Sequence, residues 1–337
     1  MPGSIPKIIL SKSFKYFYLS GSKYYSKNTF FISLLVFVFA IAYILTSIES
    51  QKNLISLIAK DFSTTIIPYF ILIILLQFVN WTLEALKFYF LLPGSKNLSF
   101  KQVLKSVYVG NLTAIVTPKK LGNFIGRNWI LKDKAKQVTI STISGNFYQL
   151  FITIIMAFCS FLYLYFFKTQ FLLELKYYFL LLVFFYSFLL FLIGYTIFNN
   201  NWHPIVNKLK LVKYFNISTD HLKSISSFKR IKVLFFAMSR YWIFIFQYYL
   251  LFKGFNIPID FLDVIILVGL LFGTVTFLPS FAPGNLGTRE ALSIFILGGS
   301  ALGIKFALVS FLVWSVNVAF SALIGAGLLF TSKTIKW

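Results

Sequence analysis

Long apolar stretches separated by basic segments dominate the chain. Seven of these stretches reach about 20 residues and carry few charges, which is the length that a helix needs to cross a lipid bilayer. They are Thr29–Ile48, Ile66–Leu92, Thr139–Phe167, Tyr177–Phe198, Val233–Phe252, Phe261–Phe281 and Phe306–Thr331. The pattern predicts an all-α, multi-pass membrane protein with seven or eight crossings.

Two further apolar segments, Val103–Thr117 and Ala291–Ile304, are too short or too interrupted to cross alone. The first stops at Pro118 and continues as a polar helix to Arg127, whereas the second contains the Gly298–Gly299 pair. Apolar runs of about 10 to 14 residues are typical of re-entrant or interfacial segments. We therefore expect two re-entrant or broken helices, with a contribution of Ala291–Ile304 to an eighth crossing as the alternative.

The composition excludes a soluble enzyme. Of 337 residues, 58% are hydrophobic and only 12% are charged, and the mean hydropathy is +0.80. Soluble domains are nearer half apolar and a quarter charged. The longest polar stretch, 199–232, is too short to form a catalytic domain with its own core. The expected organisation is a basic arm over 1–27, one transmembrane domain over 28–331 and a short tail over 332–337.

The charge distribution predicts orientation. The chain has 32 Lys and Arg against 9 Asp and Glu, a net charge of +23. Of the basic residues, 21 fall in the N-terminal arm, after the second span or within 199–232, against five in the opposite loops. Cytoplasmic loops carry such an excess, so a cytoplasmic N-terminus in the cell (inner) membrane is expected. Anionic lipids, and no nucleic acid, are the expected partners. With one cysteine and two distant histidines, no metal site and no cofactor are expected.

The first broken segment ends in a glycine-rich turn. Pro118 ends the preceding helix, and Gly122 and Gly126 allow a sharp turn or a close approach to a neighbour. Asn123 and Arg127 follow at helical i, i+4 spacing, so both can face one pocket. A guanidinium beside a helix N-terminus is a good phosphate site. The candidate head-group residues are Lys119, Lys120, Asn123 and Arg127. The alternative is an interfacial turn with snorkelling lysines.

The second broken segment repeats this arrangement. Pro283 and Gly287 share the Pro-x-x-x-Gly spacing of the first turn, with Gly284 between them and Arg289 shortly after. Paired broken segments in two halves of a membrane protein point to a transport site. We therefore expect Arg289 to bind a ligand. The alternative is that Arg289 and Glu290 form a self-contained ion pair that stabilises the turn.

Charged and polar side chains also lie inside the predicted spans. Glu84 and Lys87 are spaced for a local ion pair, and Arg240 lies in a different span. A charge inside a span is costly and is by default a functional hypothesis, although Glu84, Lys87 and Asp263 lie near enough to the ends of their spans to reach the interface. The predicted polar pathway comprises Glu84, Gln149, Arg240 and Glu290, with a structural tie between helices as the alternative for Gln149. Trp81 and Trp314 are expected in the interfacial aromatic belt.

The two turns resemble the signatures of the lysylphosphatidylglycerol synthase transmembrane-region family, a group of flippase-like membrane proteins. The matching positions are Gly110, Pro118, Gly122 and Arg127 in the first turn, and Pro283, Leu286, Gly287, Arg289 and Glu290 in the second. The resemblance covers about 28–331. It departs at Asn123, where the family usually has Glu, and at Asn285, where Gly is more common. The aminoacyl-transferase domain of full synthases has no counterpart in this sequence.

The resemblance implies a lipid translocase that moves an anionic or polyprenyl-linked lipid between the leaflets of a bacterial envelope membrane. No enzymatic activity is expected, because the chain shows no acidic pair for a metal and no nucleophile with its base. A membrane-embedded transferase is disfavoured for the same reason. A different class stays open, namely a non-transporting accessory protein of a glycosyltransferase or another envelope-lipid enzyme.

Overall fold

The computed structural model describes residues 27–49, 66–95, 98–115, 117, 122–131, 135–167, 179–199, 220–223, 225–279 and 282–331, and every regular element within these ranges is helical. The first half contains α2 (Lys27–Glu49), α4 (Ile66–Leu91), α5 (Phe100–Ile115), α6 (Gly122–Ile130), α7 (Ala135–Phe167) and α8 (Phe179–Phe198). The second half contains α11 (Asp220–Lys223), α12 (Ser227–Gly254), α13 (Phe261–Phe277), η6 (Pro283–Asn285), α14 (Thr288–Ile296), α15 (Ala301–Trp314), η7 (Ser315–Phe320) and α16 (Ser321–Phe330).

The described helices reproduce the predicted spans. Four are long and apolar enough to cross a membrane, namely α4, α7, α12 and the continuous run of α15, η7 and α16 over Ala301–Phe330. Shorter apolar helices, Leu34–Glu49, Leu182–Phe198 and Phe261–Phe277, lie within α2, α8 and α13. Each of the seven predicted spans therefore coincides with an apolar helix, and the multi-pass all-α architecture is confirmed.

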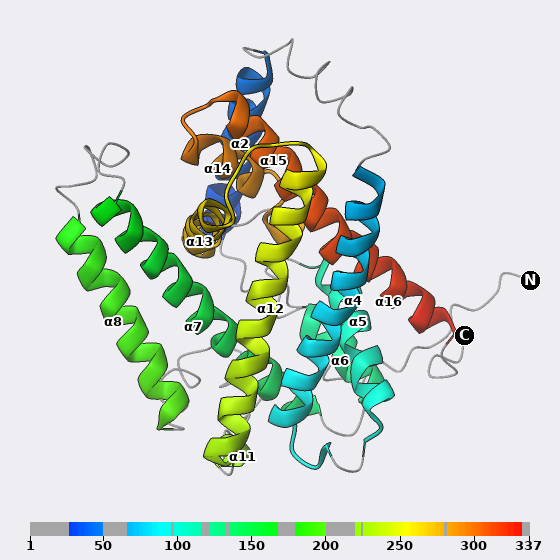
Figure 1. Cartoon of the computed structure of the whole chain (residues 1–337). Coiled ribbons are helices and arrows are strands. Elements are labelled where there is room, and N and C mark those ends of the chain that lie inside the picture. Colours follow the sequence, from blue (N-terminus) through cyan, green and yellow to red (C-terminus); the bar gives the residue numbers. More distant parts are fainter. Residues whose placement is uncertain are drawn as a thin grey trace, which may run out of the picture.

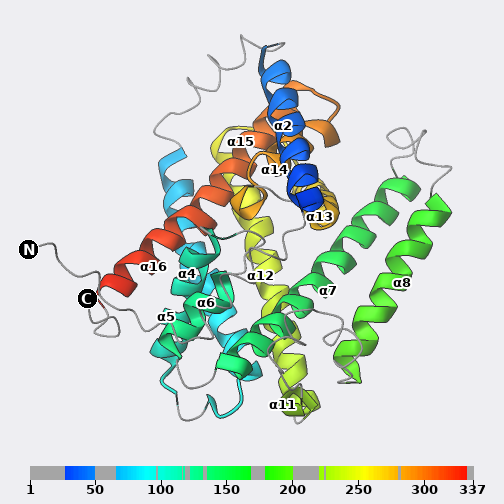
Figure 2. The ribbon, with the colours of Figure 1, turned by 180° about the vertical axis from the view of Figure 1, so that it is seen from behind.

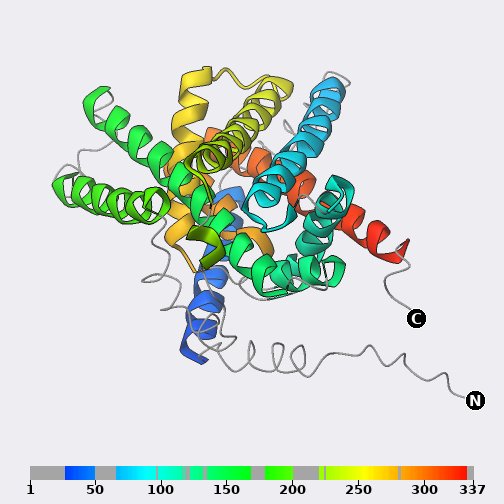
Figure 3. The same cartoon turned by 90° about the horizontal axis from the view of Figure 1, so that it is seen from below.

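The helices pack around a central pair. α4 and α12 run side by side through the middle of the molecule (Figure 1). α7 packs against α13 and α8, and α7 and α8 together lean outward on one side (Figures 1 and 3). α5, α6 and α16 cover the opposite side, and Figure 2 shows α16 crossing in front of α4. α13 is viewed almost end-on in Figure 1, so its axis crosses that of α12.

The first broken segment forms a tight helical hairpin of α5 and α6. The two helix backbones approach closely, because a Cβ added at Gly126 would overlap the carbonyl oxygen of Val109. A Cβ at Gly110 would lie 2.7 Å from Asn123 Oδ1, which is also too close. Small residues at such positions let helix backbones approach closely in membranes. The predicted return of the chain after Val103–Thr117 is thus present, with glycines on both helices.

The second broken segment is interrupted at the predicted glycine pair. Ala291–Ile304 is not one helix, because the chain turns at Gly298 and Gly299, whose φ values of 63° and 71° favour glycine. The Ser300 hydroxyl then accepts a hydrogen bond from the Gly303 N–H and begins α15. The last apolar helix therefore starts at Ala301 rather than Phe306. The contribution of Ala291–Ile304 to an eighth crossing stays a prediction. α14, with nine residues, is too short to cross.

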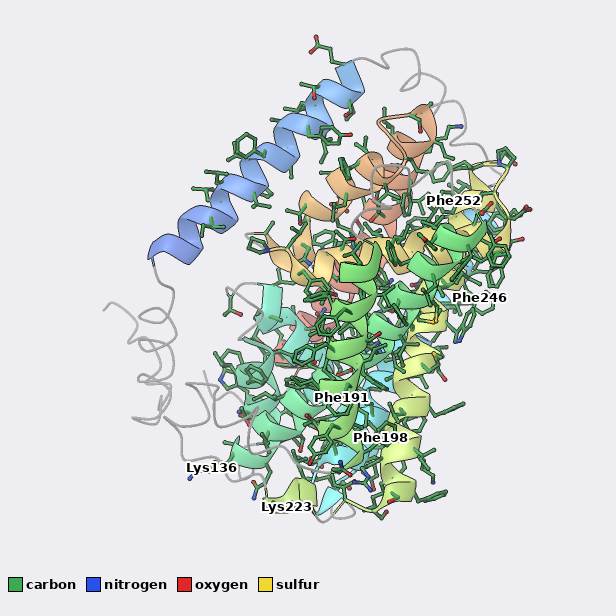
Figure 4. The ribbon with its side chains drawn as sticks, turned by 90° about the vertical axis from the view of Figure 1, so that its left-hand side faces the viewer. Lys136, Phe191, Phe198, Lys223, Phe246 and Phe252 are labelled. Atoms are coloured by element: carbon green, nitrogen blue, oxygen red, sulfur yellow. The ribbon has the colours of Figure 1, made fainter. Side chains whose placement is uncertain are left out.

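The two ends of the molecule differ in character. Figure 4 shows Lys136, at the start of α7, and Lys223, in α11, near the same end of the molecule, whereas Phe252 lies toward the other. On α8, Phe191 and Phe198 are exposed. Such exposed apolar side chains on an apolar helix suit contact with lipid. The arrangement agrees with the prediction that the segments flanking α7 and α12 at their amino ends lie on one side of a membrane.

Candidate functional site

A cavity of about 820 Å³ lies among the central helices. α4, α5, α6 and α7 contribute one part of its wall, and α12, α13, the η6 turn, α14, α15 and η7 contribute the rest. Apolar side chains such as Phe244 and Phe272 alternate with polar ones. The charged lining residues are Glu84, Lys87, Arg127, Arg240 and Arg289. The described lining thus contains four cationic side chains and one carboxylate, so its net charge is positive.

Glu84 lies at the centre of a buried ionic cluster. Its Oε2 atom is 2.6 Å from Lys87 Nζ, one turn further along α4, and also pairs with Arg240 Nη1 of α12. Its Oε1 atom accepts a hydrogen bond of 2.9 Å from Arg127 Nη2 of α6. Lys87 and Arg127 are each only 1% exposed. Charges this deeply buried need partners because removing them from water is expensive. Glu84 is the partner of three cations, which come from three different helices.

Arg127 is fixed on three sides. Its Nε donates to Asn123 Oδ1 at 2.8 Å, and its guanidinium carbon lies 4.5 Å from the centre of the Phe88 ring. The close α5–α6 packing at Gly110 leaves room for its side chain stem, since a Cβ there would meet Arg127 Cγ at 2.8 Å. Its Nη1 is buried and has no hydrogen-bond partner among the described residues. One donor of this guanidinium therefore remains available to a ligand.

A chain of amides extends the polar cluster toward the last span. Arg240 Nε donates to Asn80 Oδ1, whose Nδ2 donates to Asn317 Oδ1 at 3.0 Å. Asn317 in turn donates to Gln247 Oε1 at 2.8 Å, and the Trp81 indole N–H donates to the Asn317 carbonyl. Asn317 lies in η7, a π-helical segment that interrupts the last span. Such segments often occur at functional sites, because the wider turn alters the backbone hydrogen bonding.

The second turn places Arg289 in the wall of the same cavity. Arg289 Nη2 donates to Glu290 Oε1 and to the carbonyl of Ser310, both at 2.8 Å. Glu290 Oε2 accepts a hydrogen bond from the Gly287 N–H at 2.6 Å and so stabilises the start of α14. The predicted Arg289–Glu290 ion pair is therefore present. Arg289 Nε nevertheless remains buried with no partner among the described residues, and Arg289 lines the cavity.

The backbone of this turn explains one departure from the family pattern. Gly284 and Gly287 have φ values of 63° and 82°, and Asn285 between them has a φ of 62°. Gly adopts this left-handed conformation without steric cost, and Asn tolerates it better than most other residues. The turn therefore keeps its shape with Asn285 in place of the more common Gly.

The structure brings most of the predicted site residues together. Asn123, Arg127 and Arg289, and also Glu84, Gln149 and Arg240 of the predicted polar pathway, line one cavity. Glu290 does not line the cavity itself but accepts a hydrogen bond from Arg289, which does. Gln149 Nε2 donates to the Ala237 carbonyl of α12, so the predicted tie between helices is also present. Pro118, Lys119 and Lys120 lie outside the described residues, and Pro283 begins the η6 turn.

Sequence reasoning missed or misplaced several residues. Glu84 and Lys87 lie near enough to the span end to reach the interface, but both are buried, where they form an ion pair. Trp81 and Trp314, expected only as members of the interfacial belt, also line the cavity. The amides of Gln247 and Asn317 were not singled out. The available signal was that Asn317 is an isolated amide within an otherwise apolar span.

Comparison with known proteins identifies the class. Residues 30–325 match the family described as Lysylphosphatidylglycerol synthase TM region, and the chain belongs to this family. No curated protein and no solved structure matches the chain. The family places the protein among multi-pass membrane proteins connected with lipid metabolism or transport.

Proposed function

We propose that the protein is a lipid translocase that binds an anionic head group in the central cavity and moves the lipid between leaflets. The observation that carries this proposal is the convergence of Arg127 and Arg289, which belong to the two separate broken segments, on one cavity. Each has a buried nitrogen with no partner among the described residues. The proposal assigns the protein no covalent chemistry.

The charge of the cavity supports an anionic ligand. Buried guanidinium groups bind phosphate through charge-assisted hydrogen bonds, which are about twice as strong as neutral ones. The mixed polar and apolar wall suits an amphipathic molecule, since a head group can contact the arginines while acyl chains stay in the bilayer. Backbone that leaves a helix within a membrane is tolerated where it lines such a cavity, and η6 does so at Gly284 and Asn285.

The proposal also states from which side of the membrane the lipid reaches the cavity. With the N-terminus in the cytoplasm, α4 would end on the cytoplasmic side. Glu84 lies seven residues before Leu91, or about 10 Å along the helix, so the ionic cluster would lie in the cytoplasmic half of the cell membrane. Lys119 and Lys120 of the α5–α6 connection would then attract anionic lipid from the inner leaflet.

A leaflet-exchange assay tests the proposal. Purified protein is placed in liposomes that contain fluorescent phosphatidylglycerol or a fluorescent polyprenyl phosphate, and dithionite bleaches the outer leaflet. The wild type should allow bleaching well beyond about half of the label, and Arg127→Gln and Arg289→Gln should each reduce the rate at least about tenfold, consistent with the loss of a charge-assisted contact.

Arg230→Gln is the matched control. Arg230 lies on α12 outside the cavity, where it donates to the Ser227 hydroxyl, so this variant should keep the wild-type rate. Full activity in both cavity variants would contradict the site. Bleaching that stops at half for every lipid in wild-type liposomes would contradict translocation and favour the accessory role beside an envelope enzyme.

A further inference from the structure

The ionic cluster around Glu84 carries more positive charge than its own carboxylate can balance. Among the described residues, Lys87, Arg127 and Arg240 each pair with Glu84 and with no other carboxylate. Arginine keeps its charge in essentially all protein environments. With the Lys87 ammonium in its ion pair, this leaves an excess of two positive charges at a site where all four side chains are at least nine-tenths buried.

The other arginine of the cavity does not share this imbalance. Arg289 pairs with the adjacent Glu290, so its charge is compensated within its own turn. The uncompensated charge is therefore concentrated at the Glu84 cluster, on the α4, α6 and α12 side of the cavity. Buried charge of this kind is expensive unless it is paired, and it is most fully balanced by a ligand that supplies two negative charges.

Donors for such a ligand are present. Arg127 lines the cavity, and its Nη1 is buried without a partner among the described residues. Lys87 and Arg240 also line the cavity, so all three cations are at its wall. An incoming anion can accept a hydrogen bond from Arg127 Nη1 while Glu84 keeps its contact with Arg127 Nη2. The ligand then adds to the cluster and need not displace Glu84.

We propose that the Lys87–Arg127–Arg240 cluster selects lipids whose head group carries two negative charges, either a phosphomonoester or a diphosphate diester, over lipids with a singly charged phosphodiester. This inference rests on the proposed function, which places the lipid head group in the cavity. It adds a statement of how many negative charges that head group carries. A phosphomonoester has a second pKa of about 6, so it is largely dianionic at a pH of about 8. A phosphodiester remains a monoanion.

A binding experiment, independent of translocation, tests this inference. The protein in detergent micelles at about pH 8 is titrated with three lipids of identical short acyl chains, namely phosphatidic acid, CDP-diacylglycerol and phosphatidylglycerol. The fluorescence of Trp81 and Trp314, which line the cavity, reports binding, and calorimetry provides a second readout. At least one dianionic lipid should bind about tenfold more tightly than phosphatidylglycerol, a difference of about 1.4 kcal/mol. Whether phosphatidic acid or CDP-diacylglycerol binds better distinguishes the monoester from the diphosphate.

Variants at Lys87 link the preference to the cluster. Lys87→Gln removes one positive charge and should reduce the preference to less than about threefold, an effect smaller than 1 kcal/mol. Lys87→Arg keeps the charge and should keep the preference. Lys223→Gln removes an exposed lysine of α11 and should bind all three lipids like the wild type.

The outcomes separate this inference from the proposed function. Equal affinity of the wild type for all three lipids, or an unchanged preference in Lys87→Gln, would overturn the inference and leave translocation standing. Dianion preference without bleaching in the liposome assay would support the inference and contradict translocation. If Lys87→Gln does not fold, the wild type and Lys87→Arg still test the inference. If neither of these two proteins binds a dianionic lipid more tightly than phosphatidylglycerol, the selection of dianions is refuted.

Discussion

Replacing Glu84 with Gln should strongly destabilise the protein. Gln has nearly the same shape but no charge, so three buried cations lose their common counter-ion. The amide oxygen can still accept one or two hydrogen bonds, whereas the carboxylate binds three donors with its two oxygens. Breaking a buried ion pair by removing one partner typically costs about 3 to 5 kcal/mol, and we expect Glu84→Gln to fall in this range.

Thermal unfolding in detergent, followed by circular dichroism, checks this value. A loss of this size should lower the apparent Tm by roughly 5 to 15 °C. Asp260→Asn is the matched control, because it makes the same acid-to-amide change at an exposed position before α13, where the side chain makes no capping hydrogen bond. The control should stay within about 0.5 kcal/mol of the wild type.

A double-mutant cycle tests the electrostatic reason. Arg240→Gln alone should also destabilise, because it removes contacts with Glu84 and Asn80. When both substitutions are present, one excess cation is removed with the carboxylate. The double variant should therefore be about 1 to 3 kcal/mol more stable than the sum of the single effects predicts. A Glu84→Gln protein as stable as the wild type, or strict additivity in the cycle, would refute the reasoning.

Two further predictions follow from local backbone geometry, and a third from the proposed topology. Gly126→Ala should cost about 1 to 3 kcal/mol in thermal unfolding because its Cβ meets α5 backbone, whereas Gly327→Ala, with nothing within 4 Å, should be neutral or stabilising. Asn285→Ala should lower stability by about 1 kcal/mol because its φ is positive, and Asn285→Gly should not; equal stability of the two would contradict this account. In a cysteine-free background, a membrane-impermeant maleimide should label Lys223→Cys in inside-out vesicles and Asn256→Cys in right-side-out vesicles, and the reverse pattern would invert the proposed topology.

Local sequence signals predicted the elements well. The seven apolar stretches each became a helix, because backbone groups in a bilayer must be satisfied within their own segment. The Glu84–Lys87 and Arg289–Glu290 ion pairs were predictable, because both join residues close in sequence. The sequence misplaced the start of the last span at Phe306, because Lys305 ends the uncharged stretch there, whereas the helix begins at Ala301 directly after the turn at Gly298 and Gly299.

The sequence by itself determined that this chain is a helical membrane protein with two broken, arginine-bearing turns. Only the tertiary structure decided that Arg127 and Arg240 share the Glu84 carboxylate and that Asn317 joins their network. These partners lie on different helices, and their pairing depends on how each helix is rotated about its axis. In soluble proteins an apolar stripe reveals that rotation. In this chain a polar stripe can do the same, because Gln77, Asn80, Glu84 and Lys87 share one face of α4 and are all buried. Which residues of other helices meet that face is set by packing.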